Sequence, residues 1–327
     1  MILGGDIGGT HTRLALFGDD GRYAAGGAKH EYPSREHASL DVIVRRFASE
    51  TGVRPAAACF GVAGPVRNGR CVATNLPWIV DAAALGREFG TRTWVINDLE
   101  ATAWGLGALG ADELVELAPG AAGAVGNGAV VAAGTGLGEA GLYWDGRQHQ
   151  PFATEGGHAS FAPTDDVEAD LLRWLQGRFG QHVSWERVVS GPGLVSLYEF
   201  LRDTGRGEEP TWLAEAIRTG DPGAAIAAAA LDGRSPLAAE ALHRFVSFYG
   251  RETANFALKV MATGGVYLGG GIAPRILPKL RDGTFLAGFL DKGRMRPLLE
   301  AMPVRVVLND GTGLLGAGRC AAVRLRG

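Results

Sequence analysis

The chain begins with a short apolar run that is broken by glycine and then resumes. Residues 2 to 6 form the first run, Gly8-Gly9-Thr10 interrupts it, and residues 13 to 17 alternate between polar and apolar side chains. Asp19-Asp20-Gly21 then marks a second turn before a third short run. Period-two alternation and glycine punctuation are typical of strands and tight turns. The pattern predicts a β-meander whose first connection is a glycine turn.

A second copy of this pattern starts near residue 128. Residues 129 to 133 read as a buried strand, Gly134-Thr135-Gly136 as the turn, and residues 141 to 144 as the next strand, before Asp145-Gly146. Two similar units about one domain apart predict a duplicated architecture.

Helical and strand patterns alternate along the rest of the chain, which predicts an α/β fold. The clearest are a helix over 40–51, strands over 56–62 and 93–96, a polar loop holding Asn68 and Asn75, a helical stretch over 237–263 and a strand over 266–268. We expect a small α/β domain from residues 1–108 plus 309–327, and a large α/β domain from residues 109–308.

Composition supports a folded, two-domain chain that binds small molecules. The 327 residues are 46% hydrophobic and 20% charged, and the formal net charge is −3. Such a length exceeds what one core usually supports, and the scattered basic residues form neither a nucleic-acid stripe nor a membrane-binding patch. Three cysteines without a CxxC spacing argue against a disulfide framework and a cysteine-based zinc site. We expect a cytoplasmic protein, with no nucleic-acid partner and no membrane segment.

Glycine is abundant, with 51 residues, but the common nucleotide-binding motifs do not account for it. The chain contains no Gly-Lys step, which a P-loop needs to reach the β and γ phosphates. Two strings match GxGxxG, one starting at Gly136 and one at Gly311. The first runs into a strand, and the second lies too near the C-terminus for another βαβ strand, so both fail the context of a dinucleotide fold.

The two glycine turns are the remaining candidates for phosphate binding. Backbone amides of a bare turn can form a concave site for an anion, and Asp6 at the end of the first strand could hold Mg²⁺ through water. Either turn alone could equally be an ordinary hairpin turn. Their occurrence in duplicated settings favours phosphate binding by the predicted set, which is Gly8, Gly9, Thr10, Gly134, Thr135 and Gly136.

Asn97-Asp98 follows a predicted strand and precedes a predicted helix. A carboxylate at the end of a strand can accept the proton of an attacking hydroxyl, so Asp98 is a candidate general base, and Asn97 could hold a neighbouring hydroxyl. Glu100 lies three residues after Asn97, so a helix capping box is an alternative explanation of the same residues.

Glu155-Gly156-Gly157-His158 places an acid and an imidazole around two glycines, with no second histidine at metal spacing. A carboxylate and a histidine together suit the hydroxyls of a sugar. Taken alone, the motif could be a polar surface turn, and Glu186 could be an exposed helical acid paired with an arginine.

Together these segments resemble the bacterial glucokinase family, over nearly the whole chain. The segments that carry the resemblance are residues 6–10, 63–66, 74–75, 96–98, 134–138, 155–158, 186–193, 269–272 and 313–316. His11 departs from the family's first turn, which commonly reads Gly-Gly-Thr-Asn. The chain lacks the cysteine cluster of the related zinc-binding sugar kinases and repressors, which favours the non-zinc branch.

The resemblance implies a two-lobed hexokinase/actin-like ATPase (ribonuclease H-like) fold, with duplicated mixed-sheet domains around a cleft. It implies ATP-dependent phosphorylation of the 6-hydroxyl of glucose with Mg²⁺, the first step of glycolysis, by a homodimer. Asp98 would be the catalytic base. The implied glucose-binding residues are Asn75, Asn97, Asp98, Glu155, His158 and Glu186. Gly269, Gly270 and Gly271 would bind the nucleotide near its adenosine.

Two rival functions stay open at this point. The chain could phosphorylate another hexose, such as mannose, fructose or an N-acetylhexosamine, because pocket detail sets that choice. It could also be a catalytically silent sugar sensor of the same fold. An actin-like filament protein fits less well, because it would have no use for the polar cluster at Asn97, Glu155 and His158.

Overall fold

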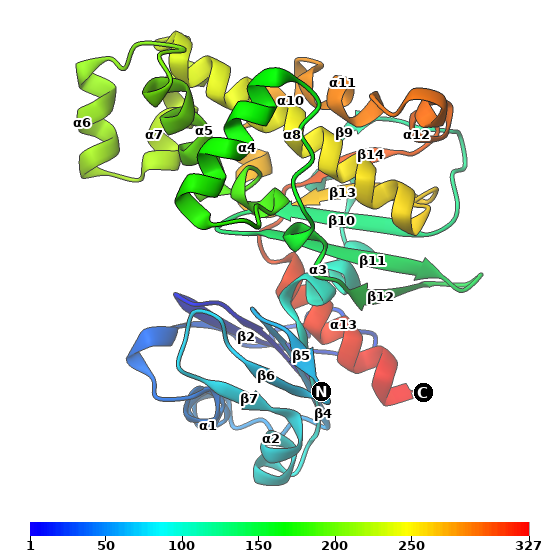
Figure 1. Cartoon of the computed structure of the whole chain (residues 1–327). Helices are drawn as coiled ribbons and strands as arrows, with labels where there is room; N and C mark the ends of the chain where they lie inside the picture. The colour runs from blue at the N-terminus through cyan, green and yellow to red at the C-terminus, as the bar shows by residue number, and fades with distance from the viewer. Residues whose placement is uncertain (327) are drawn as a thin grey trace. The chain divides into compact units, whose positions relative to one another are not determined.

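A computed structural model describes residues 1–326 of the chain, shown in Figure 1. The contacts divide the chain into two compact units. Unit 1 consists of Met1–Glu113, Gln148–Ala153 and the segment from Asn309 onward, and unit 2 consists of Leu114–Arg147 and Thr154–Leu308. The predicted two-domain division stays a prediction. Among the described residues, no helix is both long enough and apolar enough to cross a membrane.

Unit 1 is built on a five-stranded sheet in the order β3-β2-β1-β4-β8. Its strands are β1 (Ile2–Ile7), β2 (His11–Phe17), β3 (Lys29–Pro33), β4 (Ala57–Val62) and β8 (Arg92–Asn97). Strand β1 runs antiparallel to β2 and parallel to β4, and β4 runs parallel to β8. The predicted meander around the first glycine turn is therefore confirmed.

Alternation along these strands gives the sheet two apolar faces, each covered by helices. Leu3 and Ile7 share one buried cluster with α1 (Leu40–Thr51) and α2 (Ala82–Phe89). Ile2 points to the other cluster, which includes side chains of α3 (Asp98–Leu106) and α13 (Thr312–Arg326). The short elements η1 (Ser34–Glu36), η2 (Ala111–Glu113) and β12 (His149–Ala153) also belong to unit 1.

Helices α3 and α13 pack unusually closely because two glycines face the contact. A Cβ on Gly105 of α3 would lie 2.1 Å from the Thr312 carbonyl oxygen, and one on Gly316 of α13 would lie 1.7 Å from the Ala101 carbonyl oxygen. Neither position could accept a side chain without moving the helices apart. The start of α3 is thereby tied to the last helix of the chain.

The predicted loop around Asn68 is wrong, because the segment forms a small antiparallel sheet. Its strands are β5 (Val66–Arg67), β6 (Arg70–Val72) and β7 (Ile79–Asp81). Asn68 and Gly69 both have positive φ, at 52° and 73°, and join β5 to β6. Asn-Gly is a strong signal for a two-residue hairpin turn, and the sequence interpretation overlooked it. Asn75 lies in a turn, as predicted.

Unit 2 repeats the same strand arrangement. Strands β11 (Leu137–Trp144), β10 (Gly128–Ala133), β13 (Gly265–Gly269), β14 (Val304–Val307) and β9 (Leu114–Ala118) lie side by side in that order. Strand β10 is antiparallel to β11 and parallel to β13, which is parallel to β14. An antiparallel hairpin followed by two parallel strands thus occurs in both units, which confirms the predicted duplication.

Helices cover the sheet of unit 2, and the longest, α8 (Pro236–Val260), lies across β10 and β13 (Figure 1). Its predicted C-terminus at residue 263 is three residues too late, because Met261 adopts φ of 53° and ends the helix. The other helical elements are η3 (Gly156–His158), α4 (Asp166–Phe179), η4 (Trp185–Arg187), α5 (Gly191–Asp203), α6 (Thr211–Thr219), α7 (Pro222–Leu231), α9 (Ile272–Arg275), α10 (Leu277–Arg281), α11 (Thr284–Leu290), η5 (Gly293–Met295) and α12 (Arg296–Glu300).

Candidate active site

The β1–β2 turn of unit 1 presents unused backbone amides. The amide of Gly8 donates to the His11 carbonyl at 2.9 Å, which closes the turn. Within residues 1–326, the amides of Gly9 and Thr10 have no hydrogen-bond partner. A Cβ on Gly9 would lie 2.7 Å from the Asn75 Cβ, so Asn75 lies directly against the turn. The structure therefore brings together the predicted first phosphate turn and one predicted sugar residue.

Asp6 lies one residue before the end of β1, in a largely buried position. Burial raises the pKa of its carboxyl group above the usual value, while the Arg13 guanidinium opposes this shift. Arg13 is itself held by Glu31 at 2.9 Å and by Asp310 at 3.2 Å. A Cβ on Gly313, in the first turn of α13, would lie 3.7 Å from Asp6 Oδ1. The Asp6 carboxylate has no hydrogen-bond partner within the described chain, which leaves its oxygens available to a ligand.

Asn97 is the N-cap of α3, which confirms the helix-capping role of Asn97 in the alternative interpretation. Its Oδ1 accepts from the amides of Leu99 at 2.8 Å and Glu100 at 3.3 Å. Asn97 Nδ2 also donates to the Gly64 carbonyl at 3.1 Å. One hydrogen on Nδ2 is left for any further partner.

Asp98 is the first residue of α3, and its surroundings favour the protonated form. Burial raises the pKa of its carboxyl group to about 6, and the negative charge of Asp6 adds to the effect. A hydrogen bond from the Leu99 amide to Asp98 Oδ1, at 2.9 Å, acts in the opposite direction. A carboxylate with a pKa near 6 is ionised at neutral pH, yet it accepts a proton more readily than an ordinary aspartate. This is the property required of a general base.

The β10–β11 turn of unit 2 has the same character. The Gly134 amide donates to the Gly136 carbonyl at 2.8 Å, and the Gly134 carbonyl accepts from the Gly191 amide at 2.8 Å. Within the described residues, the amides of Thr135 and Gly136 have no hydrogen-bond partner. A second turn with free amide donors is therefore present.

Glu186 lies against this turn. Its Oε2 accepts from the Leu137 amide at 3.0 Å, and a Cβ on Gly136 would lie 2.4 Å from the same oxygen. The sequence places Glu186 in the sugar-binding set, and the structure adds a contact with the turn assigned to phosphate. One carboxylate oxygen thus holds the turn, and the other has no such contact.

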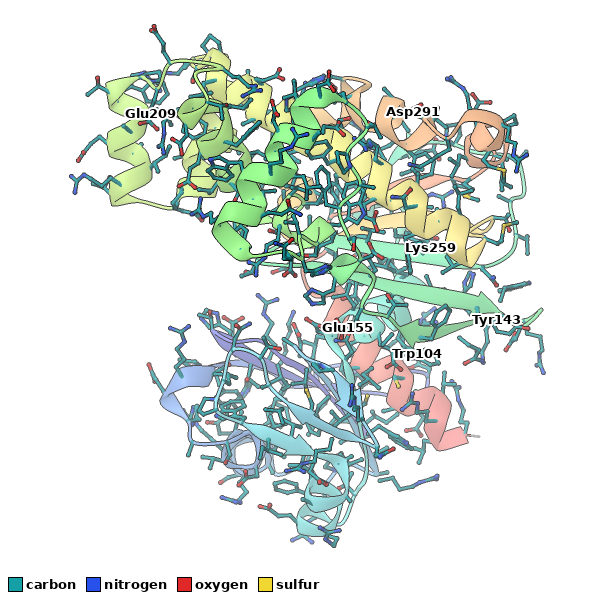
Figure 2. The ribbon with its side chains drawn as sticks, viewed as in Figure 1. Trp104, Tyr143, Glu155, Glu209, Lys259 and Asp291 are labelled. Atoms are coloured by element: carbon teal, nitrogen blue, oxygen red, sulfur yellow. The ribbon has the colours of Figure 1, made fainter. Side chains whose placement is uncertain are left out.

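Glu155 is the N-cap of the short helix η3 and His158 is its last residue, and Figure 2 labels Glu155. Glu155 Oε2 is 3.8 Å from His158 Nε2, and both side chains are more than half exposed, at 63% and 59%. The His158 carbonyl accepts from His182 Nε2 at 3.1 Å. The two predicted side chains are therefore near each other and free to meet a ligand.

The glycines at the end of β13 lie beside the β10–β11 turn. Gly270 has φ of +79°, and a Cβ there would lie 2.3 Å from the Ala133 carbonyl oxygen at the end of β10. No atom would lie within 4 Å of a Cβ on Gly271, so its backbone faces open space. The structure thus brings Gly269–Gly271 next to the β10–β11 hairpin, as expected if both contact one nucleotide.

Comparison with known proteins gives the family of this chain. The glucokinase family model matches residues 3–324. The glucokinase of Nostoc sp. (strain PCC 7120) is 41% identical over 338 residues, which cover 98% of this chain and 99% of that protein. The chain belongs to the glucokinase family. The resemblance inferred from its motifs is confirmed.

Solved structures of glucokinases agree with this assignment. The crystal structure of a glucokinase from an Antarctic psychrotroph has a TM-score of 0.83, at 32% identity, and covers 98% of each chain. A ROK family glucokinase from Streptomyces griseus, in complex with glucose and AMPPNP, shares the fold with a TM-score of 0.63 at 23% identity over 98% of each chain. The predicted α/β fold class is confirmed.

Two residues beside the predicted site residues escaped the sequence interpretation. Thr102 donates to the Asp98 carbonyl at 3.0 Å and lies near Gly313 and Asp6. Glu139 is buried beneath the turn that carries Glu155 and His158. Only Glu139 left a signal in the sequence, because an acid within the apolar stretch Leu137 to Leu142 contradicts its surroundings.

Proposed function

We propose that this member of the glucokinase family is an ATP:D-glucose 6-phosphotransferase. It transfers the γ-phosphoryl group of ATP to the 6-hydroxyl of glucose and releases ADP and glucose 6-phosphate. The observation that carries the proposal is Asp98, a buried carboxylate at the N-terminus of α3 whose pKa is raised to about 6. The glucose and AMPPNP in the related Streptomyces griseus structure support the choice of substrates.

Asp98 accepts the proton of the glucose 6-hydroxyl as its oxygen bonds to the γ-phosphorus. The bond from that phosphorus to the bridging oxygen breaks, and ADP leaves with the electron pair. In such transfers the protein mainly positions groups and stabilises charge. The free amides of Gly9, Thr10, Thr135 and Gly136 are suited to donate to phosphate oxygens.

The residues of unit 1 fit a magnesium ion. Asp6 offers carboxylate oxygens without a protein donor, and oxygen is the ligand type that Mg²⁺ prefers. We assign Asp6 to Mg²⁺, through water. When bound with ATP, the ion neutralises charge on the phosphates.

Sugar contacts are assigned to Asn75, Asn97, Glu155, His158 and Glu186. Carboxylates accept from sugar hydroxyls, and histidine can accept or donate. The remaining hydrogen on Asn97 Nδ2 can donate to one hydroxyl oxygen. We further propose that Gly269–Gly271 contacts the adenosine, that the protein is a cytoplasmic homodimer and that its product enters glycolysis.

A coupled assay that detects ADP tests the function directly. Glucose, mannose, fructose and N-acetylglucosamine would be compared with ATP and with polyphosphate as donors. We expect the highest kcat/KM with glucose and ATP. A higher value with another hexose would change the substrate, and no ADP release with any sugar would identify a silent sensor. Light scattering of the purified protein tests the dimer.

A further inference from the structure

Unit 2 contains two buried glutamates that the proposed reaction does not use. Glu139 lies on β11 and is 1% exposed, and Glu252 lies on α8 and is 0% exposed. Both side chains are in the space between the sheet and α8, where Tyr249 Oη also donates to the Val131 carbonyl at 3.0 Å. Val131 pairs with Glu139 across the strands. Acids are almost never fully buried unless they are paired.

The two glutamates must share a proton. Glu252 Oε2 accepts from Asn255 Nδ2 at 2.8 Å, but within residues 1–326 no donor reaches Glu252 Oε1 or either oxygen of Glu139 while both groups are ionised. The carboxyl groups of Glu139 and Glu252 are close enough to hydrogen-bond each other. A bond between two carboxyl groups requires one of them to be protonated. The pair therefore exists as one acid and one carboxylate.

The surrounding charges make Glu139 the proton carrier. Burial, followed by the charge of Glu252, raises the pKa of Glu139 to about 8, although the Lys259 ammonium opposes this. Burial also raises the pKa of Glu252, but Asn255, Lys259, Glu139 and Lys292 all act to lower it. Lys259, labelled in Figure 2, lies on α8 two turns after Glu252. Glu139 thus donates the shared hydrogen bond, and Glu252 accepts it.

The Glu139 carboxyl group supports the η3 turn directly. A Cβ on Gly156 would lie 1.8 Å from Glu139 Oε2, and the φ of Gly156 is not positive, so only lack of space requires glycine here. Thr154 Oγ1 donates to the Glu139 carbonyl at 2.8 Å and accepts from the Gly156 amide at 3.3 Å. A Cβ on Gly157 would lie 2.0 Å from the Leu137 carbonyl oxygen. Strand β11 and the Glu139 side chain therefore form the floor of the turn.

We propose that the Glu139–Glu252 acid pair positions the η3 turn for glucose binding. The proton shared by the two carboxyl groups holds the turn in place, and loss of this proton weakens sugar binding without changing phosphoryl transfer. When Glu139 ionises, two like charges face each other in a low-dielectric interior and repel strongly. Because Glu139 lies directly against Gly156, a movement of its carboxylate away from Glu252 would shift the turn that carries Glu155 and His158. This inference rests on the proposed sugar-binding role of those two residues.

Glucose affinity as a function of pH tests the shared proton. Calorimetry on the parent should show binding weaken about tenfold between about pH 7 and pH 9.5, as Glu139 loses its proton. Glu139→Gln keeps a donor toward Glu252 but cannot ionise, so its affinity should stay constant over that range. Glu240 is an exposed acid on α8, the helix that carries Glu252, and Glu240→Gln should show the same dependence of glucose affinity on pH as the parent. A flat parent profile, or an equal loss in Glu139→Gln, overturns the proposal. The kcat of Glu139→Gln should stay within about twofold of the parent.

A double-mutant cycle tests the contact without changing pH. Gly156→Ala should weaken glucose binding about tenfold in the parent, but less than about twofold in a Glu139→Ala background, where space is available. Gly157→Ala is the matched control, because its new Cβ would contact the Leu137 backbone. Glu139→Ala leaves that backbone in place, so the effect of Gly157→Ala should be the same in both backgrounds. Equal effects of Gly156→Ala in both backgrounds overturn the proposed contact.

Thermal unfolding without sugar separates this inference from the proposed function. Some carboxyl groups have a higher pKa in the folded protein than in the unfolded protein. The fold then loses stability as the pH rises from the unfolded pKa to the folded pKa of the group, because the charged form is disfavoured in the fold. Glu139→Gln should therefore gain Tm relative to the parent between pH 4.5 and about 8. A protein that shows this gain but neither binds nor phosphorylates glucose would refute the proposed function alone. A constant Tm difference would refute the acid pair.

Discussion

The β1–β2 hairpin of unit 1 and the β10–β11 hairpin of unit 2 have the same backbone plan but different chemistry. Each is antiparallel, ends in a glycine turn with free amides and is followed in its sheet by two parallel strands. Asp6 lies one residue before the end of β1, and the corresponding residue of β10 is Ala132. The duplicated scaffold therefore carries an acid in one copy only.

Unit 2 places its acid beside the turn instead of within the strand. Glu186 accepts a hydrogen bond from the Leu137 amide. In unit 1, burial raises the pKa of both Asp6 and Asp98, and the negative charge of Asp6 adds to the shift of Asp98. Under the proposed function, Asp6 and Asp98 of unit 1 act on metal and protons, whereas unit 2 mainly supplies binding contacts. Changes to Asp6 and Asp98 should therefore lower kcat, and changes in unit 2 should raise KM.

The largest effect is expected for Asp98→Asn. Losing a general base usually costs about a hundred- to ten-thousand-fold in rate, and the amide cannot accept the hydroxyl proton. Steady-state kinetics should show this fall in kcat, while calorimetry shows glucose affinity close to that of the parent. Turnover within about tenfold of the parent would remove Asp98 from this role.

Asp6→Asn should have the next largest effect. Because we assign its contact with Mg²⁺ to a bridging water, kcat should fall about ten- to a hundredfold, and the Mg²⁺ concentration for half-maximal rate should rise. Asp20→Asn, in an exposed turn of the same unit, is the matched control and should match the parent. An unchanged Mg²⁺ requirement would contradict the assignment.

The rate should also depend on pH as the raised pKa of Asp98 requires. Asp98 accepts a proton only when ionised, so kcat/KM for glucose should fall about tenfold per pH unit below pH 6. This range lies well below the expected loss of glucose affinity near pH 8. A profile that stays flat down to pH 5 would exclude Asp98 as the titrating base.

Glycine substitutions in the two turns should produce smaller effects, on affinity. Gly136→Ala would push the Glu186 carboxylate off the Leu137 amide and should raise the KM for ATP about three- to tenfold, because overpacking costs about 1–3 kcal/mol. Gly9→Ala meets the Asn75 Cβ, which cannot swing away, and should cost at least as much. Gly177→Ala, with open space around it, is the control for folding. A fall in kcat with unchanged KM for Gly136→Ala would contradict the proposal that the turn of unit 2 mainly supplies binding contacts.

The smallest expected effect is a change in the free energy of unfolding when Asp98 is replaced by Asn. The pKa of Asp98 is raised from 3.8 to about 6, so its charge destabilises the fold increasingly as pH rises through that range. Asp98→Asn should therefore be more stable than the parent by about 1–3 kcal/mol at pH 8, with little difference below pH 4. Thermal unfolding at both pH values measures this, and a Tm gain that is equal at both would contradict the cause.

Local patterns predicted the strands and turns well, because alternation and glycine position depend on near neighbours. The helix at 40–51 and both glycine hairpins appear where the sequence placed them. The Asn68-Gly69 hairpin was missed although its signal was present. The contact of Glu186 with Leu137, 49 residues away, could not be predicted, since tertiary packing alone decides it.

The site residues were likewise predictable where they lie close together in the sequence, and not where tertiary packing brings them together. Residues within one motif, such as Asn97 and Asp98, could be assigned chemistry from their spacing, and the structure shows that Asn97 also caps a helix. The Glu139–Glu252 pair joins a strand to a helix 113 positions away. Sequence could flag the buried acid, but only the fold reveals its partner.

The close packing of α13 on α3 has a consequence for protein synthesis. The strands of unit 1 are synthesised before most of unit 2, yet one face of their sheet is covered by Thr312–Arg326, which follows all of unit 2 in the chain. Domains made early usually fold before the chain is finished. Here the nascent unit 1 must wait, with that face uncovered, until all of unit 2 has been synthesised and α13 has emerged.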